Sequence, residues 1–326
     1  MGKNLLLGVD AGTSKTHAVI TDRLGRVLGF GKSGCGNYEN VGFEGMTASI
    51  NKAVQEALHH SGGSKSDLLA MGFGLAGYDW PSERELMVKA IETLEIPADY
   101  DLVNDVELGL IAGTRNGVGI AVDAGSGNNI RGRNKIGEIG RITGNGIFFG
   151  ELGGASELVW QSLIAVTYAW TKRGPKTGLT DLLKSHLGVE SEFCLIEGLA
   201  TGKFLPSAII AKDIFHLASA GDSVAIEIIH HSAVDLAENV IAVTNQLNFE
   251  NEAFDIVLMG SVFKAGDIFT KPFKELIINF APKVHIATLK VLPVIGAILL
   301  AAEKANILTN SFRDNLTLLN MDTFHS

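Results

Sequence analysis

The tetrapeptide Val-Asp-Ala-Gly occurs twice in this chain, at residues 9–12 and 122–125, and each copy follows a short apolar run. The first copy continues through Thr-Ser-Lys-Thr to residue 16, and the second continues through Ser-Gly to residue 127. An apolar run that ends in a glycine-rich turn is typical of a buried strand whose turn lets backbone N–H groups approach a ligand. A repeated strand and turn therefore predicts two related domains.

The duplication extends beyond the four residues. Three short strands are expected at the start of each half, and each set precedes an alternation of helices and strands. The first half predicts strands at 4–9, 16–21, 27–31, 68–77 and 99–105, with helices at 43–60, 81–94 and from 106. The second half predicts strands at 117–127, 128–134, 135–144, 254–260 and 283–289, mostly helix over 152–247 and 263–280, and a closing helix at 293–305.

This pattern predicts an α/β protein with two related mixed sheets and flanking helices around a central cleft for a nucleotide and a substrate. We expect an N-terminal domain over residues 1–115 and a C-terminal domain over residues 116–326, with the chain end packing back on the first domain.

Composition excludes several classes of partner. The 326 residues carry a formal net charge of −9 and no basic run, which argues against nucleic acid and anionic membranes. The cysteines, Cys35 and Cys194, have neither disulfide nor metal-site spacing, which favours a reducing cytoplasm. No apolar run approaches the roughly 18 residues of a membrane-spanning helix.

Asp10 constrains the function, because a carboxylate beside a phosphate loop would repel the phosphate. The loop is no Walker A motif, since Ser14 rather than Gly precedes Lys15. The Gly-x-Gly-x-x-Gly match at 72–77 is not followed by an opening helix, which argues against a Rossmann dinucleotide site. Mg²⁺ is usually held by one or two carboxylates and by substrate phosphates, so Asp10 could place the cation that bridges to the ligand. The alternative is that both Val-Asp-Ala-Gly segments are only tight turns.

These segments resemble the superfamily of acetate kinase, sugar kinases, the seventy-kilodalton heat-shock chaperones and actin. The resemblance is closer to the BadF/BadG/BcrA/BcrD-type ATPases, which include the N-acetylglucosamine kinases. It covers nearly the whole chain through six ordered segments. They are the first phosphate motif at 8–29, "GLAGYD" at 74–79, "VNDVELGLIAGT" at 103–114, the second phosphate motif at 122–134, the adenosine motif "IVLMGSVF" at 256–263 and "LPVIGAILLAA" at 292–302.

The resemblance implies two ribonuclease H-like domains, ATP and Mg²⁺ as cofactors, and a set of site residues. Asp10 matches the aspartate associated with Mg²⁺, and Asp105 matches the catalytic aspartate beside the sugar hydroxyl. Nucleotide contacts are expected at Gly12, Thr13, Ser14, Lys15, Thr16, Gly125, Ser126, Gly127, Gly260 and Ser261. The alternative role for Asp105 is an N-cap of a helix over Val106–Gly113.

Substrate contacts are expected at Asn37, Asn104, Asp105, Gly144, Asn145, Gly146 and Glu151. Two of them depart from the family pattern, because Asn145 stands where the family has Trp and Glu151 where it has Asp. Alternatives remain for Asn37 as part of a surface turn and for Glu151 as a carboxylate at the start of a helix.

The resemblance implies an ATP-dependent kinase that phosphorylates a hydroxyl of a sugar or amino sugar, with N-acetylglucosamine or glucosamine expected. We also expect a homodimer. An ATPase that activates a radical dehydratase, or a nucleotide-dependent sensor without transfer activity, is the alternative. Neither cysteine lies near the second phosphate motif, where such activators place their iron–sulfur ligands.

Overall fold

The computed structural model describes residues 4–317, which divide into two compact units. The first unit combines the chain up to Ala121 with Arg133–Lys135 and the residues from Thr288 onward. The second unit comprises Val122–Gly132 and Ile136–Ala287. The last strand and the closing helices of the chain thus fall in different units, and each unit is described by itself below.

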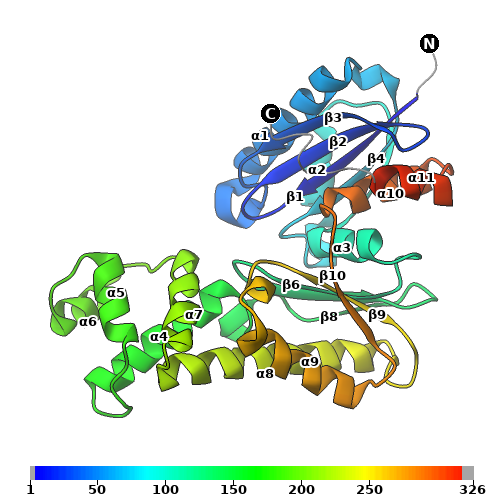
Figure 1. The fold of residues 1–326 in the computed structure, drawn as a ribbon. Coiled ribbons are helices and arrows are strands. Elements are labelled where there is room, and N and C mark those ends of the chain that lie inside the picture. Colours follow the sequence, from blue (N-terminus) through cyan, green and yellow to red (C-terminus); the bar gives the residue numbers. More distant parts are fainter. Residues whose placement is uncertain (1–3, 318–326) are drawn as a thin grey trace. The chain divides into compact units, whose positions relative to one another are not determined.

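The first unit contains a five-stranded sheet in the order β3-β2-β1-β4-β5 (Figure 1). The strands are β1 (Leu5–Ala11), β2 (Thr16–Asp22), β3 (Val27–Ser33), β4 (Leu68–Leu75) and β5 (Asp99–Asn104). Strand β1 pairs antiparallel with β2 and parallel with β4, and β5 is parallel to β4. The carboxyl ends of β1, β4 and β5 therefore lie at the same edge of the sheet, where Asp10 and Asp105 are found.

Helices cover both faces of this sheet because the strands are apolar on both sides. Helix α1 (Tyr38–Ser61) packs on β2 and β3, and α10 (Val294–Lys304) packs on β1 and β4. A Cβ atom on Gly8 would lie 2.7 Å from the backbone nitrogen of Ile298, so glycine allows α10 to approach β1 closely. The unit also contains α2 (Arg84–Glu92), α3 (Asp105–Gly113) and α11 (Asn310–Thr317).

The second unit contains a five-stranded sheet in the order β10-β9-β6-β7-β8. In the opposite direction this order is β8-β7-β6-β9-β10, which corresponds strand for strand to β3-β2-β1-β4-β5 of the first sheet. Its strands are β6 (Gly119–Ala124), β7 (Asn128–Arg133), β8 (Ile139–Arg141), β9 (Asp255–Met259) and β10 (His285–Thr288). This topology confirms the prediction of two related mixed five-stranded sheets with flanking helices.

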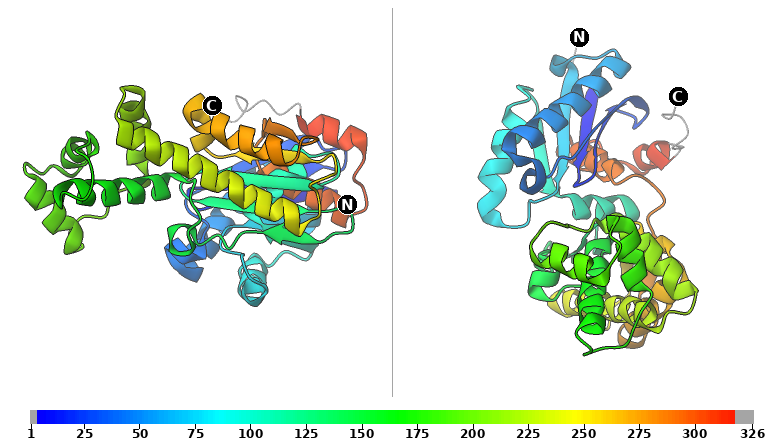
Figure 2. Two further views of the ribbon diagram at one scale, coloured as in Figure 1. Left: turned by 90° about the horizontal axis from the view of Figure 1, so that it is seen from below. Right: turned by 90° about the vertical axis from the view of Figure 1, so that its left-hand side faces the viewer.

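The helices of the second unit form two groups. Helices α8 (Ser223–Gln246) and α9 (Asp267–Phe280) lie side by side along the sheet (Figures 1 and 2). Helix α4 (Ala155–Trp170) packs with α5 (Leu179–Leu187), α7 (Ala211–Ser219) and α8, and α6 (Glu192–Ala200) packs on α5. Among the described residues, no helix is both long and apolar enough to cross a membrane.

Two helices differ from the sequence prediction. Helix α1 begins at Tyr38 rather than 43, and Gly42 interrupts it with φ of 70° and ψ of 173°. The regular part of the helix thus begins where the apolar pattern begins. Helix α11 was not predicted, because it is short and buries only Phe312 and Leu316 among its described side chains.

Candidate active site

The first phosphate turn joins β1 to β2. Asp10 is the penultimate residue of β1, and its side chain is only 8% exposed. The Gly12 N–H donates to the Lys15 carbonyl at 2.9 Å, while the Gly12 carbonyl accepts from the Gly36 N–H at 2.9 Å. Within residues 4–317, the exposed N–H groups of Thr13 and Ser14 donate no hydrogen bond. Such N–H groups in a tight turn can bind an anionic ligand.

Thr16 is the exception among the residues predicted for this turn. Its side chain is completely buried, and its hydroxyl donates to the Gly34 carbonyl at 2.9 Å. This hydroxyl is therefore not available to phosphate in the structure. It instead fastens the segment that precedes α1 to the base of the turn.

Asp105 lies beside the first turn. One oxygen, Oδ1, accepts from the Val106 N–H at 3.0 Å, and Oδ2 lies 3.9 Å from the position of an ideal Cβ on Gly12. The interpretation of Asp105 as the N-cap is wrong, because Asn104 caps α3 and Asp105 is the first residue within the helix. The helix start thus positions the Asp105 carboxylate close to the phosphate turn, as a catalytic base would require.

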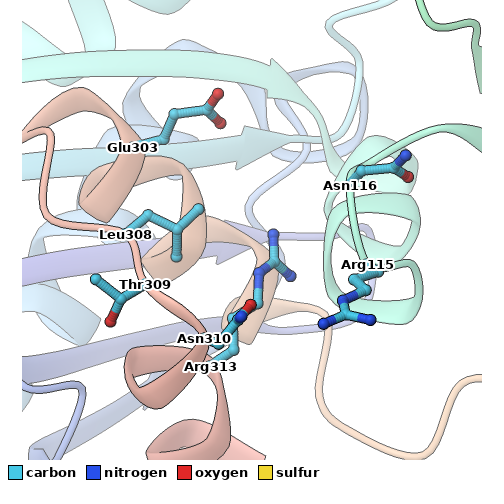
Figure 3. Close-up of a pocket in the computed structure, with 7 residues that line it drawn as sticks. All are labelled: Arg115, Asn116, Glu303, Leu308, Thr309, Asn310 and Arg313. Carbon is cyan, nitrogen blue, oxygen red and sulfur yellow. The ribbon is translucent and has the colours of Figure 1, made fainter.

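Helix α3 is also held in place by contacts at positions beyond Asp105. Gly296 of α10 lies against the Leu108 carbonyl, where a Cβ would clash. At the far end of α3, Arg313 Nη1 donates to the carbonyls of Ile111 at 3.5 Å and Thr114 at 3.4 Å. Figure 3 shows Arg313 of α11 and Arg115 at the end of α3 beside a pocket of about 430 Å³. Helices α10 and α11, late in the sequence, therefore fix the helix that carries Asp105.

Asn104 is buried at the end of β5. Its side chain is 1% exposed, and its Oδ1 accepts from the Val106 N–H at 3.1 Å. Its Nδ2 donates to the Tyr78 carbonyl at 3.2 Å and to Asp79 Oδ1 at 3.3 Å. These bonds join the loop after β4 to the start of α3, so Asn104 positions Asp105.

Asn37 is the N-cap of α1 rather than part of an exposed turn, since its Oδ1 accepts from the Glu39 N–H at 2.9 Å. The side chain is buried, and Nδ2 donates to Thr13 Oγ1 at 3.4 Å and to Glu39 Oε2 at 3.3 Å. Asn37 therefore lies beside the first phosphate turn, although it is 24 residues from Thr13 in sequence.

The second phosphate turn in the other unit has a related hydrogen-bond pattern. The Gly125 N–H donates to the Gly127 carbonyl at 2.9 Å. The start of α4 closes on the same turn, because the Ser156 N–H donates to the Ser126 carbonyl at 2.8 Å. Gly260 has φ of 94°, and its ideal Cβ would lie 2.7 Å from the Gly125 nitrogen. The predicted second phosphate and adenosine turns are thus adjacent, and Ser261 is exposed beside them.

Glu151 organises the predicted substrate loop. Its carboxylate accepts from the Thr143 N–H at 2.7 Å, the Thr143 hydroxyl at 2.9 Å, the Gly144 N–H at 3.0 Å and the Asn145 N–H at 3.1 Å. Four donors match the roughly four lone-pair positions of a carboxylate, so any further donor to Glu151 must displace one of them. The helix-start alternative is wrong, because Glu151 precedes α4 and Glu157 is the acid in its first turn.

Glu157 is a further candidate that the sequence analysis missed. It is buried beside a glycine of the predicted substrate loop and a glycine of the second phosphate turn. Its Oε1 lies 2.7 Å from an ideal Cβ on Gly146 and 3.9 Å from one on Gly127. Oε2 has no hydrogen-bond partner within the described residues. Burial raises the pKa of Glu157, and the nearby Glu151 raises it further. No sequence signal indicated Glu157 as a site residue, because an acid in the first turn of a helix is a common pattern.

Asp123 was also missed as a site residue, although it belongs to the repeated tetrapeptide. It is the penultimate residue of β6, as Asp10 is of β1. Burial raises the pKa of the Asp123 carboxyl to about 6.

We expect Glu157→Gln to stabilise the protein at pH 8 and to have little effect on stability near pH 4. The pKa of Glu157 is higher in the folded state than in the unfolded state, so this carboxyl costs no stability below its unfolded pKa. The cost appears as the pH rises through the folded pKa, and Gln removes it. Chemical unfolding of both proteins at the two pH values measures the effect. An equal difference at pH 4 and pH 8 would contradict the assignment.

The comparison with protein families identifies the chain. Residues 7–301 match the model of the BadF/BadG/BcrA/BcrD ATPase family. The chain belongs to this family. The match includes both phosphate turns, α3 with Asp105, and the Gly260 turn, so it spans both units.

Named relatives of this family member are sugar kinases. The N-acetylmuramic acid/N-acetylglucosamine kinase of Clostridium acetobutylicum is 27% identical over 92% of this chain and 99% of the relative. The N-acetyl-D-glucosamine kinase of Dictyostelium discoideum is 28% identical over 92% of this chain and 98% of the relative. A ROK family glucokinase of Streptomyces griseus, solved with glucose and AMPPNP, has a TM-score of 0.58 and 18% identity over 92% of this chain and 99% of that chain. At that identity the likeness shows a shared fold.

Proposed function

We propose that the chain is an ATP-dependent sugar kinase that transfers the γ-phosphoryl group to a hydroxyl of a sugar or amino sugar. The observation that carries the proposal is the placement of Asp105, whose Oδ2 lies 3.9 Å from the Cβ position of Gly12 in the phosphate turn. Phosphoryl transfer depends mainly on positioning and charge stabilisation, together with a carboxylate that orients the attacking hydroxyl. The names of the two curated relatives support the same activity.

The residues present fit a magnesium nucleotide. Asp10 supplies a carboxylate at the carboxyl end of β1, and the N–H groups of Thr13 and Ser14 suit phosphate oxygens. Mg²⁺ would neutralise charge on the phosphates. Further nucleotide contacts are proposed for Gly12, Lys15, Gly125, Ser126, Gly127, Gly260 and Ser261.

On the substrate side, Asp105 accepts the proton of the sugar hydroxyl as it attacks. Asn104 and Asn37 hold the loops around Asp105, and Glu151 holds the backbone of Gly144 and Asn145. The proposed sugar contacts are Asn37, Asp105, Gly144, Asn145, Gly146 and Glu151, with Asn104 as a positioning residue.

The proposed substrates are N-acetylglucosamine and glucosamine, because both curated relatives are named as kinases of N-acetylglucosamine. Asn145 stands in place of the family's Trp and so removes an aromatic surface from this loop. We propose that the protein acts in the cytoplasm as a homodimer. The exposed apolar side chains Trp160, Ile164 and Tyr168 along α4 support self-association, which sedimentation equilibrium would test.

The experiment is a coupled assay of ADP release with Mg²⁺ and ATP across glucosamine, N-acetylglucosamine, N-acetylmannosamine, N-acetylmuramic acid and glucose. We expect ADP release that depends on one or more of these sugars, with a phosphorylated sugar detected by mass spectrometry. ADP release at the same rate without any sugar would instead support the ATPase or sensor alternative.

A further inference from the structure

A basic pocket lies at the edge of the sheet in the first unit, on β3 and the start of β2. It has a volume of about 620 Å³, and its lining includes Lys15, His17, Lys32, Lys52 and Glu56. His17 and Lys32 are directly opposite each other in the β2–β3 ladder, and Lys52 and Glu56 come from α1. Side chains from three separate segments thus converge on one space.

The charges in this pocket are unbalanced. Lys15, Lys32 and Lys52 are exposed, and within residues 4–317 none of their ammonium groups forms an ion pair. The carboxylate in the pocket, Glu56, accepts from the Lys32 backbone N–H at 2.8 Å. Three cations and one anion leave an excess of positive charge in a chain with a net charge of −9. Like charges held close together repel one another, and an anion between them relieves the repulsion.

His17 provides an independent sign of an unsatisfied site. Its side chain is 8% exposed, and its Nδ1 has no hydrogen-bond partner within the described residues. Burial, together with the nearby ammonium groups of Lys15 and Lys32, lowers the pKa of His17 to about 4. Both cations therefore act on one buried imidazole that is neutral at pH 7 and can still hydrogen-bond.

We propose that this pocket binds a phosphate dianion between Lys15, Lys32 and Lys52, as inorganic phosphate or as the phosphate group of a small phosphomonoester. A lysine ammonium suits this ligand because it is a compact charge with three donors. Two net positive charges balance the dianion.

The pocket is connected to the first phosphate turn. The carbonyl of Lys15 accepts from the Gly12 N–H and so closes that turn. A phosphate bound to the Lys15 side chain also restrains the Lys15 backbone, which closes the turn. Phosphate binding is therefore expected to change the Kd of nucleotide at the turn. By linkage, nucleotide changes the Kd of the phosphate by the same factor.

The test is calorimetric titration of the full chain with inorganic phosphate and, separately, with glucose 6-phosphate, at low ionic strength. Each titration is done with and without saturating Mg²⁺ and AMPPNP. Phosphate bound only at the nucleotide turns is displaced completely by AMPPNP, whereas phosphate in the pocket is bound with a changed Kd that still depends on Lys32 and Lys52. The variant is Lys32→Gln/Lys52→Gln, which leaves Lys15 and the phosphate turn intact. The matched control is Lys176→Gln/Lys212→Gln, which removes two exposed charges from the other unit.

We expect the parent and the control to bind phosphate with Kd values within about twofold of each other, because isolated surface charges contribute little. The Lys32→Gln/Lys52→Gln variant should bind at least about tenfold more weakly, since it loses two charge-assisted hydrogen-bond donors to the phosphate. Tighter binding of glucose 6-phosphate than of phosphate would identify an ester as the ligand.

Equal affinity of the parent and the Lys32→Gln/Lys52→Gln variant would overturn the proposal, and so would the absence of binding by a folded parent at millimolar phosphate. Thermal unfolding of all three proteins without ligand establishes that the variants are folded. The measurement needs no turnover, so its outcome is independent of whether the chain phosphorylates a sugar.

Discussion

Asp105→Asn is expected to lower kcat for the best sugar by about 10²–10⁴-fold, the usual contribution of a general base. The substitution retains the size of the side chain and an oxygen that can accept from the Val106 N–H, but it removes the base. The KM for ATP should change little, because the nucleotide contacts are proposed at other residues. Stability should also change little, because Asn104 rather than Asp105 caps α3.

Glu107→Gln is the matched control for this variant. Glu107 is the other acid in the first turn of α3, so its substitution removes the same charge from the same end of the helix dipole. We expect kcat of the control to stay within about threefold of the parent, a change far smaller than the loss of a general base would cause. If Asp105→Asn also stayed within about threefold of the parent, the proposed role of Asp105 would be incorrect.

Asp10→Asn is expected to weaken binding of the magnesium nucleotide by about 10–100-fold, which corresponds to the loss of one interaction with a charged group. The cause is the loss of a carboxylate that Mg²⁺ prefers as a ligand. Titration calorimetry with AMPPNP, in Mg²⁺ and separately in EDTA, measures the effect. The difference between the parent and the variant should disappear in EDTA, because the metal is then absent from both.

Asp99→Asn is the control for Asp10, since Asp99 is an exposed aspartate at the start of β5 in the same unit. It should bind nucleotide like the parent in both buffers. Equal Kd values for Asp10→Asn and the parent in Mg²⁺ would exclude the metal role. A similar loss of affinity in EDTA would instead assign Asp10 to the shape of the turn.

The sequence predicted most of the fold because the signals were local and repeated. The two Val-Asp-Ala-Gly turns end the first strand of each sheet in chain order. These strands, β1 and β6, are the central strands of two sheets with the same topology. A short apolar run located β2, while the apolar stripe placed the regular part of α1 after Gly42. Helix α11 escaped prediction because too few of its side chains are apolar for a helical period to be recognised.

The sequence also singled out the chemical groups of the candidate site, but not their surroundings. Asp10, Asp105 and the two glycine turns were predicted from residue type and motif. Their positions depend on residues far away in sequence, such as Arg313, which bonds to carbonyls at the end of α3, and Gly260, which lies against the backbone of Gly125. No local pattern encodes such pairs, because they form only when segments distant in sequence pack together within each unit.

Tertiary structure therefore decided which polar residues face a ligand and which support the site. Thr16 and Asn104 have residue types that suit ligand binding, yet both are buried and bonded to the backbone. Glu157 was overlooked in the sequence, yet it lies against glycines of two predicted loops. The physical reason is that residue type fixes which hydrogen bonds a side chain can make, whereas burial and neighbouring segments decide which of them it does make.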